Sequence, residues 1–183
     1  MAAIAGFPLA APATHSGGGQ VSRASSKVLV AYFSRSGNTR VIAGLLTRAF
    51  GAAIFEIQPA TPYPEEYLAT VKKATEERDQ RIEPLLGGKV SDIASYGTVY
   101  LGFPIWGETA PSVIRSFLKA HDLSGKTLVP FITHGGYGLG DSQKVLTSHA
   151  PKSRIEKPFV MQADQERRTM ETVNAWLQQR AGS

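Results

Sequence analysis

A buried strand that leads directly into a turn of small polar residues constrains this chain more than any other feature. Residues 28–33 form an apolar run typical of a strand inside a parallel sheet, and apolar residues then recur with helical spacing over residues 41–50. The turn between them ends at the start of the helix, where free backbone N–H groups and the helix dipole favour an anion. The sequence therefore predicts an anion-binding turn after the first strand.

The composition of this turn supports the same prediction. It consists of Ser34, Arg35, Ser36, Gly37, Asn38 and Thr39. Hydroxyl and amide side chains add hydrogen-bond donors, and Gly37 has no Cβ to hold an anion away from the backbone. A ring of neutral donors can bind a phosphate without Lys or Arg. The same residue types also cap helices for local reasons, so the turn alone leaves both interpretations open.

The 34–39 turn and two later loops all resemble motifs of one protein family. The turn resembles the S/T-x-S/T-G-N-T phosphate loop of flavodoxins. Residues 102–111 (GFPIWGETAP) resemble the G-x-P-I-W-x-G-x-x-P loop of flavodoxin-like proteins, and residues 133–138 (THGGYG) resemble their T-x-G-G-x-G loop. Each loop follows an apolar strand, and the resemblance runs from about Lys27 to the C-terminus. It implies a protein that binds flavin mononucleotide (FMN).

The resemblance also assigns a part of FMN to each loop. The 34–39 turn would bind the phosphate. Beside the isoalloxazine ring it places Pro104, Ile105, Trp106, Gly107 and Glu108, with Trp106 as an aromatic wall. Against the pyrimidine edge it places Thr133, His134, Gly135, Gly136, Tyr137 and Gly138, with Tyr137 over the second face of the ring. The family often has a second Trp and then Gly after the first Trp, where this chain has Gly107 and Glu108.

Plainer interpretations of two of these residues stay open. Trp106 also fits a structural tryptophan on a loop between a strand and a helix. A lone histidine such as His134 is more often a surface or supporting residue than a catalytic acid. The other three histidines show no metal-ligand spacing and the chain has no cysteine, so the sequence predicts no metal site.

The elements along the chain predict a doubly wound fold. Strands are expected over residues 28–33, 53–57, 98–103, 128–132 and 155–161. Helices are expected at 41–50, where Gly51 supplies a stop, at 65–78, and after Pro111, Asp141 and Asp164, with Asp141 and Asp164 as caps. The buried face of the helix after Pro111 is predicted to consist of Val113, Ile114, Phe117 and Leu118. This alternation predicts an α/β protein with a five-stranded doubly wound parallel sheet. The resemblance implies that this sheet is flavodoxin-like, in strand order 2-1-3-4-5. The three loops would then meet at the switch point between strands one and three. Pro130 is awkward for a central strand.

Charge and composition limit the kinds of partner that the chain is expected to bind. The chain has 183 residues and a formal net charge of +5, with no Lys/Arg cluster. The sequence thus predicts no nucleic-acid partner, and no run is apolar enough for an integral membrane segment. Residues 1–26 are read as a flexible tail or the remnant of a secretory signal, and 27–183 as the flavodoxin-like domain, which leaves a cytoplasmic or an exported location open.

Three functions remain open at this stage. The first is FMN-dependent electron transfer or reduction, with a redox partner protein or a small-molecule acceptor such as a quinone. The second is a quinone reductase that takes electrons from NAD(P)H. The third is a flavin-free binding module on the same fold. A P-loop NTPase and a hydrolase with a G-x-S-x-G elbow are excluded because both motifs are missing.

Overall fold

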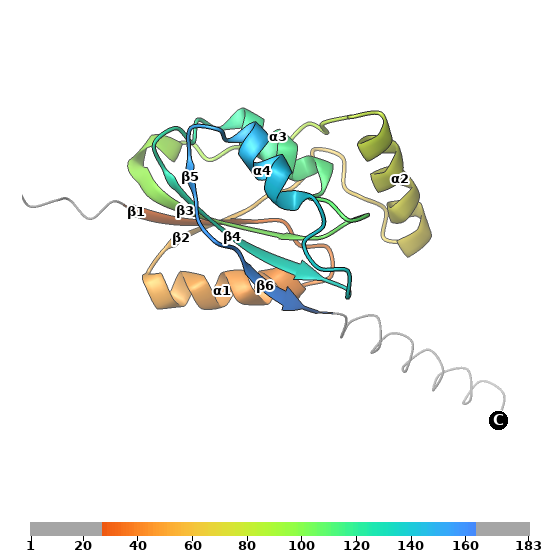
Figure 1. The fold of residues 1–183 in the computed structure, drawn as a ribbon, viewed down its shortest axis with the longest axis horizontal. Coiled ribbons are helices and arrows are strands. Elements are labelled where there is room, and N and C mark those ends of the chain that lie inside the picture. The colour runs from red at the N-terminus through yellow and green to blue at the C-terminus, as the bar shows by residue number, and fades with distance from the viewer. Residues whose placement is uncertain (1–26, 164–183) are drawn as a thin grey trace, which may run out of the picture.

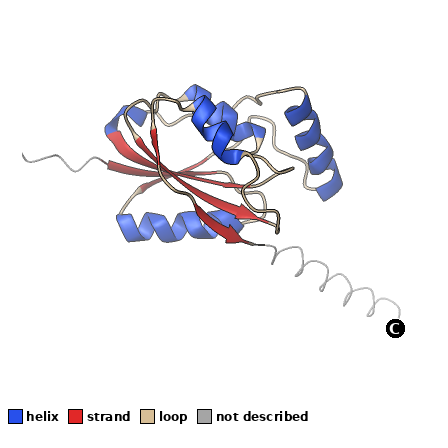
Figure 2. Ribbon diagram, in the orientation of Figure 1, coloured by secondary structure: helices blue, strands red, loops and turns tan. Residues whose placement is uncertain are grey.

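A parallel sheet forms the middle layer of the molecule, with helices on both faces (Figures 1 and 2). This computed structural model describes residues 27–163. The elements in chain order are β1 (Lys27–Tyr32), α1 (Asn38–Phe50), β2 (Ala53–Glu56), α2 (Tyr67–Asp79), the short 3₁₀ helix η1 (Ile93–Ser95), β3 (Tyr96–Pro104), α3 (Ser112–Ala120), β4 (Thr127–His134), α4 (Ser142–His149), β5 (Arg154–Ile155) and β6 (Phe159–Gln162).

The strand order confirms the predicted fold. The path is β2-β1-β3-β4-β5, every pairing is parallel, and β6 pairs with β4 beyond β5. Helix α1 covers one face of the sheet, while α3 and α4 cover the other and α2 packs beside α3 (Figure 1). Helices on both faces are what a parallel sheet requires, because its strands are apolar on both sides.

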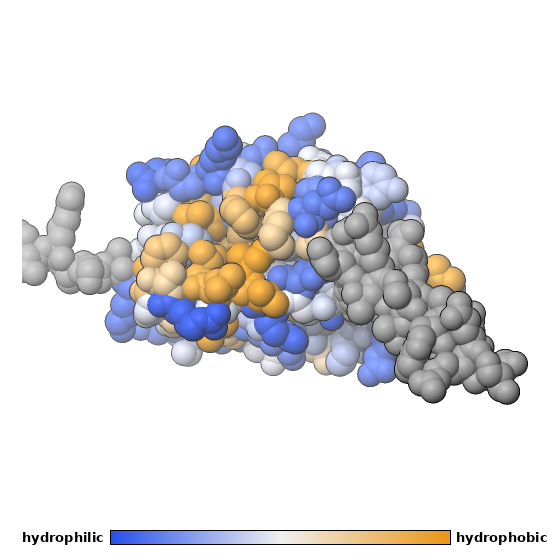
Figure 3. Space-filling view, turned by 90° about the horizontal axis from the view of Figure 1, so that it is seen from below, coloured by the Kyte–Doolittle hydropathy of each residue, from blue (hydrophilic) through white to orange (hydrophobic). Residues whose placement is uncertain are grey.

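The two faces of the sheet differ in how completely they are covered. On the α3 side, the predicted buried residues Val113, Ile114, Phe117 and Leu118 are all buried. On the α1 side, Ile42 and Ala43 are the buried apolar residues of the helix, and the exposed apolar residues include Val41, Leu45, Phe50, Phe159 and Met161. Figure 3 shows apolar side chains gathered on this side. The helix predicted after Asp164 lies outside the described residues.

The fifth strand is divided, which the sequence did not predict. β5 pairs with Thr127 and Leu128 of β4, and β6 resumes at Phe131, so the outer strand leaves the sheet opposite Pro130. The Leu128 carbonyl of β4 accepts the Glu156 N–H at 2.9 Å, so Leu128 faces the outer strand. Because alternate residues of a strand face the same side, the backbone nitrogen of Pro130 also faces the outer strand. Pro130 has no N–H to offer there. The break in the outer strand therefore falls where the central strand lacks a donor.

Helix ends agree with the sequence in one case and differ in two. Gly51 ends α1 with φ of 56°, the left-handed conformation predicted for a glycine stop. Helix α2 begins at Tyr67 rather than near Pro64, because the Glu66 side chain accepts the N–H groups of Leu68 and Ala69. Asp141 stands at the start of α4, but its side chain makes no capping hydrogen bond, so that predicted cap is wrong.

Candidate functional site

The loops after β1, β3 and β4 are joined by direct hydrogen bonds. The hydroxyls of Thr39 and Thr133 lie 2.9 Å apart and are buried. The Ile105 N–H donates to the Thr133 carbonyl at 2.8 Å. Thr133 thus ties the 34–39 turn to both other loops, and the structure brings the three predicted segments together at the carboxyl ends of the strands.

The 34–39 turn presents backbone donors at the N-terminus of α1. Gly37 has φ of 93°, and its N–H donates to the Ser34 hydroxyl at 3.1 Å. Within residues 27–163, no hydrogen bond uses the N–H groups of Ser36, Asn38, Thr39 and Arg40. These free donors and the helix dipole form an anion cradle.

The one cation of the turn points away from this cradle. Arg35 donates to the Glu65 carbonyl at 2.7 Å, and its guanidinium lies 5.8 Å from the centre of the Tyr67 ring. Asn38 donates from its side chain to the Ala163 carbonyl at 2.9 Å. An anion bound here would therefore meet neutral donors, in line with the predicted phosphate chemistry.

The 104–108 loop ends in a tight turn. Trp106 and Thr109 exchange backbone hydrogen bonds of 3.0 and 3.3 Å across Gly107 and Glu108. These two residues have φ of 56° and 65°, so both central positions are left-handed. That conformation is unfavourable for Glu108, and it is held from outside: the Glu108 carbonyl accepts the Asp141 N–H at 2.9 Å.

Trp106 packs inside an aromatic cluster. Its ring meets those of Phe33 and Tyr63 edge to face, at centroid distances of 5.1 and 4.9 Å. The ring is half-buried, so it supports the loop from below. The plainer structural role is therefore present in the molecule, and a contact between Trp106 and a flavin stays a prediction.

A buried carboxyl group lies beneath this cluster, and the sequence analysis did not single it out. Glu77 of α2 is 4% exposed, and it accepts the Tyr63 hydroxyl at 2.8 Å. Burial raises the pKa of Glu77, while the Tyr63 hydrogen bond and nearby Lys73 act in the opposite direction. Burial also raises the pKa of Tyr63. The fold therefore favours a protonated Glu77 more than water does.

We expect Glu77→Gln to raise the free energy of unfolding at pH 7. The raised pKa means that the charged carboxylate opposes folding at pH above the ordinary value of about 4.3, and this penalty disappears below it. The gain from the substitution should therefore be present at pH 7 and absent near pH 4. Urea unfolding at both pH values tests this, with Glu76→Gln on the exposed face as the control. If Glu77→Gln lowered the free energy of unfolding more at pH 7 than at pH 4, the raised pKa of Glu77 would be contradicted.

The 133–138 loop is organised around His134. Its Nδ1 accepts the N–H groups of Gly136 and Gly138 at 3.0 and 3.2 Å, which places the ring proton on Nε2. Gly136 and Gly138 have φ of 120° and 73°, so the turn needs glycine at both positions. Tyr137 at the tip is 82% exposed. His134 therefore has a supporting role in shaping the loop.

A cavity of about 200 Å³ lies between the two later loops. Its lining is formed by Ile105, Gly107, Glu108, His134, Gly135 and Tyr137. All six are residues that the sequence predicted beside a cofactor. The Thr39–Thr133 hydrogen bond joins the anion-cradle turn to the strand end that leads into one wall of this cavity. The arrangement fits an elongated molecule with a phosphate at one end and a flat ring system at the other.

Two further features are absent from the described residues, a metal-binding cluster and a membrane-spanning helix. Residues 27–163 hold no group of three His, Asp or Glu side chains placed to bind a metal ion. No helix within the same residues is long and apolar enough to cross a membrane.

Comparison with known proteins identifies the family. A family model described as Flavodoxin matches residues 27–180. A protein from Bacteroides eggerthii, provisionally described as a flavoprotein, is 35% identical over 84% of this chain and 96% of its own, with a TM-score of 0.68. A similarly described protein from Bacteroides uniformis is 33% identical over 84% and 98%, with the same TM-score. This chain belongs to the flavodoxin family.

A more distant structure shares the fold. A flavoprotein from Lactobacillus acidophilus, solved in complex with FMN, is 17% identical over 79% of this chain and 97% of its own, with a TM-score of 0.66. A comparison with curated proteins gives no match.

Proposed function

We propose that this protein binds FMN non-covalently and transfers electrons through it. One observation carries the proposal: the turn with unused backbone N–H groups at Ser36, Asn38, Thr39 and Arg40 is hydrogen-bonded to Thr133, the residue that precedes the His134–Tyr137 wall of the cavity between the two later loops. The first feature suits a phosphate dianion, and the second suits a flat ring system.

The cofactor agrees with the family. FMN is the expected ligand of a flavodoxin, and the chain belongs to that family. The related flavoprotein from Lactobacillus acidophilus holds FMN on the same fold. Both findings support FMN as the cofactor of this chain, as the sequence predicted.

Each loop has a separate task in this proposal. Bound FMN supplies one- and two-electron transfer. The 34–39 turn binds its phosphate through neutral donors, and Arg35 stays on the surface. The hydrogen bond between Ile105 and Thr133 joins the two later loops, and the cavity between these loops would hold the ring. At Gly107 the peptide can rotate without a Cβ penalty, which lets a backbone carbonyl or N–H face the ring edge.

Charge favours a second candidate over a simple acidic electron carrier. The formal net charge is +5, whereas flavodoxins that carry electrons at low potential are typically acidic. An NAD(P)H-dependent quinone reductase is therefore the alternative that we propose within the same site. The donor, the acceptor and the number of electrons per step distinguish it from a carrier.

The absorption spectrum of the purified protein tests the cofactor. We expect flavin bands and one FMN per chain, with the released cofactor identified by mass spectrometry. A colourless protein that stays unable to bind added FMN would overturn the proposal and support the flavin-free module. A redox titration with NADPH and with a quinone then separates the two activities: a reductase is reduced rapidly by NADPH and reoxidised by the quinone.

A further inference from the structure

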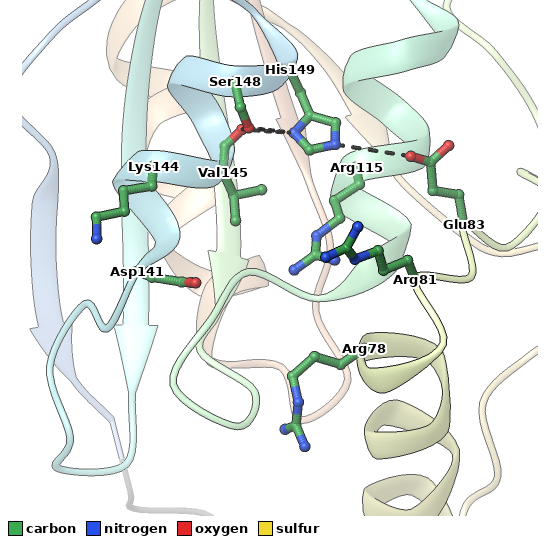
Figure 4. A pocket seen from close by; sticks show the side chains of 9 residues that line it. All are labelled: Arg78, Arg81, Glu83, Arg115, Asp141, Lys144, Val145, Ser148 and His149. Carbon is green, nitrogen blue, oxygen red and sulfur yellow. Dashed lines mark hydrogen bonds and ion pairs between the residues drawn. The ribbon is translucent and has the colours of Figure 1, made fainter.

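A second hollow, outside the candidate flavin site, lies between α2, α3 and α4. It encloses about 470 Å³, within the range of small-molecule sites. Figure 4 shows the side chains that line it. Four are cationic, namely Arg78, Arg81, Arg115 and Lys144, against the two carboxylates of Glu83 and Asp141. We call it the arginine hollow.

The carboxylates of the hollow do not neutralise these cations. Glu83 is already engaged by Lys119 at 2.8 Å and approaches His149 at 3.9 Å. Within residues 27–163, Arg81, Arg115 and Lys144 form no ion pair. Figure 4 shows the guanidinium groups of Arg81 and Arg115 directed into the same space. Like charges held together in this way favour an anion between them.

Arg115 carries a donor that the described chain leaves unused. Its Nε atom is buried and has no hydrogen-bond partner within the described residues. The far end of the same guanidinium reaches the Thr109 hydroxyl at 3.5 Å. A buried donor without a partner is unfavourable, and an anion in the hollow would satisfy it.

Arg81 stands where a glycine would be easier to accommodate. The Arg81 N–H donates to the Arg78 carbonyl and the Ile82 N–H to the Glu77 carbonyl, which is the Schellman end of a helix. The residue at this position adopts φ of 55°. Glycine takes that conformation without strain and arginine does not. The chain thus holds a cation at this point against the preference of its backbone.

The hollow and the candidate flavin cavity are neighbours. A Cβ at Gly107 would collide with the Arg78 guanidinium, so Arg78 lies directly against the Gly107 peptide. Gly107 itself lines the cavity between the later loops. The Gly107–Glu108 turn therefore separates the two spaces.

We propose that the arginine hollow binds a small phosphorylated molecule through two phosphate groups in close succession. Arg78 is paired with Asp79 at 2.9 Å. The Arg81 and Arg115 forks, which Figure 4 shows directed into the same space, therefore carry the site, with the Lys144 ammonium group in the same lining. Two forks match several phosphate oxygens, whereas a single carboxylate would leave most of their N–H donors unpaired. Free pyrophosphate and a dinucleotide both carry two linked phosphates, and this pyrophosphate group is the ligand that we propose. This site stands whether or not the chain carries a flavin.

Calorimetry with inorganic pyrophosphate at low ionic strength tests the proposal. We expect one site per chain in the FMN-saturated protein, and the same site in the Ser36→Glu variant, whose 34–39 turn repels anions. Arg81→Gly should weaken pyrophosphate binding about tenfold or more, while the melting temperature stays equal or rises, because glycine suits φ of 55°. Arg115→Gln should weaken it similarly. Arg48→Gln removes one cation from α1 on the opposite face and should leave the affinity unchanged.

Three results would overturn the proposal: no binding of pyrophosphate, loss of binding in Ser36→Glu, or an equal loss in Arg48→Gln and Arg81→Gly. Displacement of pyrophosphate by NADH would support a dinucleotide as the source of the phosphates. Binding of pyrophosphate without displacement by NADH would support a free polyphosphate. The flavin spectrum of each sample reports FMN binding separately, so failure of this site and failure of the proposed function are distinguishable.

Discussion

Ser36→Glu is expected to weaken FMN binding by at least about a hundredfold and to leave riboflavin binding nearly unchanged. Ser36 is exposed at the mouth of the anion cradle, beside the unused N–H groups of α1. A carboxylate there, at roughly 5 Å from the phosphate and an effective dielectric of about 20, repels each phosphate charge by about 3 kcal/mol. Riboflavin has no phosphate and escapes this repulsion.

Ser36→Gln is the matched control for this prediction. It has nearly the same size as the glutamate variant but no charge, so it should retain most of the FMN affinity. Calorimetry of both variants with FMN and with riboflavin supplies the comparison. An equal loss of affinity for FMN and riboflavin, or an equal loss of FMN affinity in the two variants, would contradict the assignment of the phosphate to the 34–39 turn.

Gly140→Ala is expected to lower the free energy of unfolding by about 2–4 kcal/mol and to weaken flavin binding with it. Gly140 has φ of 52°, and a Cβ there would collide with the backbone carbonyl of Glu108. No side-chain rotation relieves a collision with backbone. The Glu108 carbonyl also accepts the Asp141 N–H, so the variant would displace the Gly107–Glu108 turn that lines the cavity.

Gly88→Ala is the control for this second substitution. Position 88 has no neighbour within 4 Å of an added Cβ and no left-handed conformation, so the change should be nearly neutral. Urea unfolding of the two variants, followed by FMN titration, gives both readouts. A Gly140→Ala protein with unchanged stability would show that the Glu108 carbonyl moves freely, and the loop would then not be held by α4.

The sequence predicted the strand order and the three loops because both depend on local patterns. Apolar runs bounded by turns identify buried strands, and the resemblance of the three loops to flavodoxins implied the strand order and hence which strand ends meet. The Thr39–Thr133 hydrogen bond gives a direct contact between two of those ends. The division of the fifth strand escaped prediction because it depends on pairing: Pro130 marks a local difficulty, but only the neighbouring strand shows where it takes effect.

Other features of the molecule depend on contacts that sequence patterns do not encode. Glu77 appears in the sequence as one acid among several on a polar helix, and only the fold shows that it is buried and accepts a hydrogen bond from Tyr63. Arg78, Arg81 and Arg115 are likewise scattered cations in the sequence. The hollow that collects them arises from the packing of α2, α3 and α4, so the even spread of charge along the chain gave no sign of it.

The gap between β5 and β6 is also a natural point at which to open or extend the chain. Glu156 and Lys157 are exposed, and the ladder beside them is already interrupted at Pro130. A peptide inserted after Lys157 would pay mainly the entropy of a longer loop, which grows slowly with length. An epitope or a fluorescent reporter placed there would stand on the outer edge of the sheet, anchored on both sides by strands that already pair independently with β4.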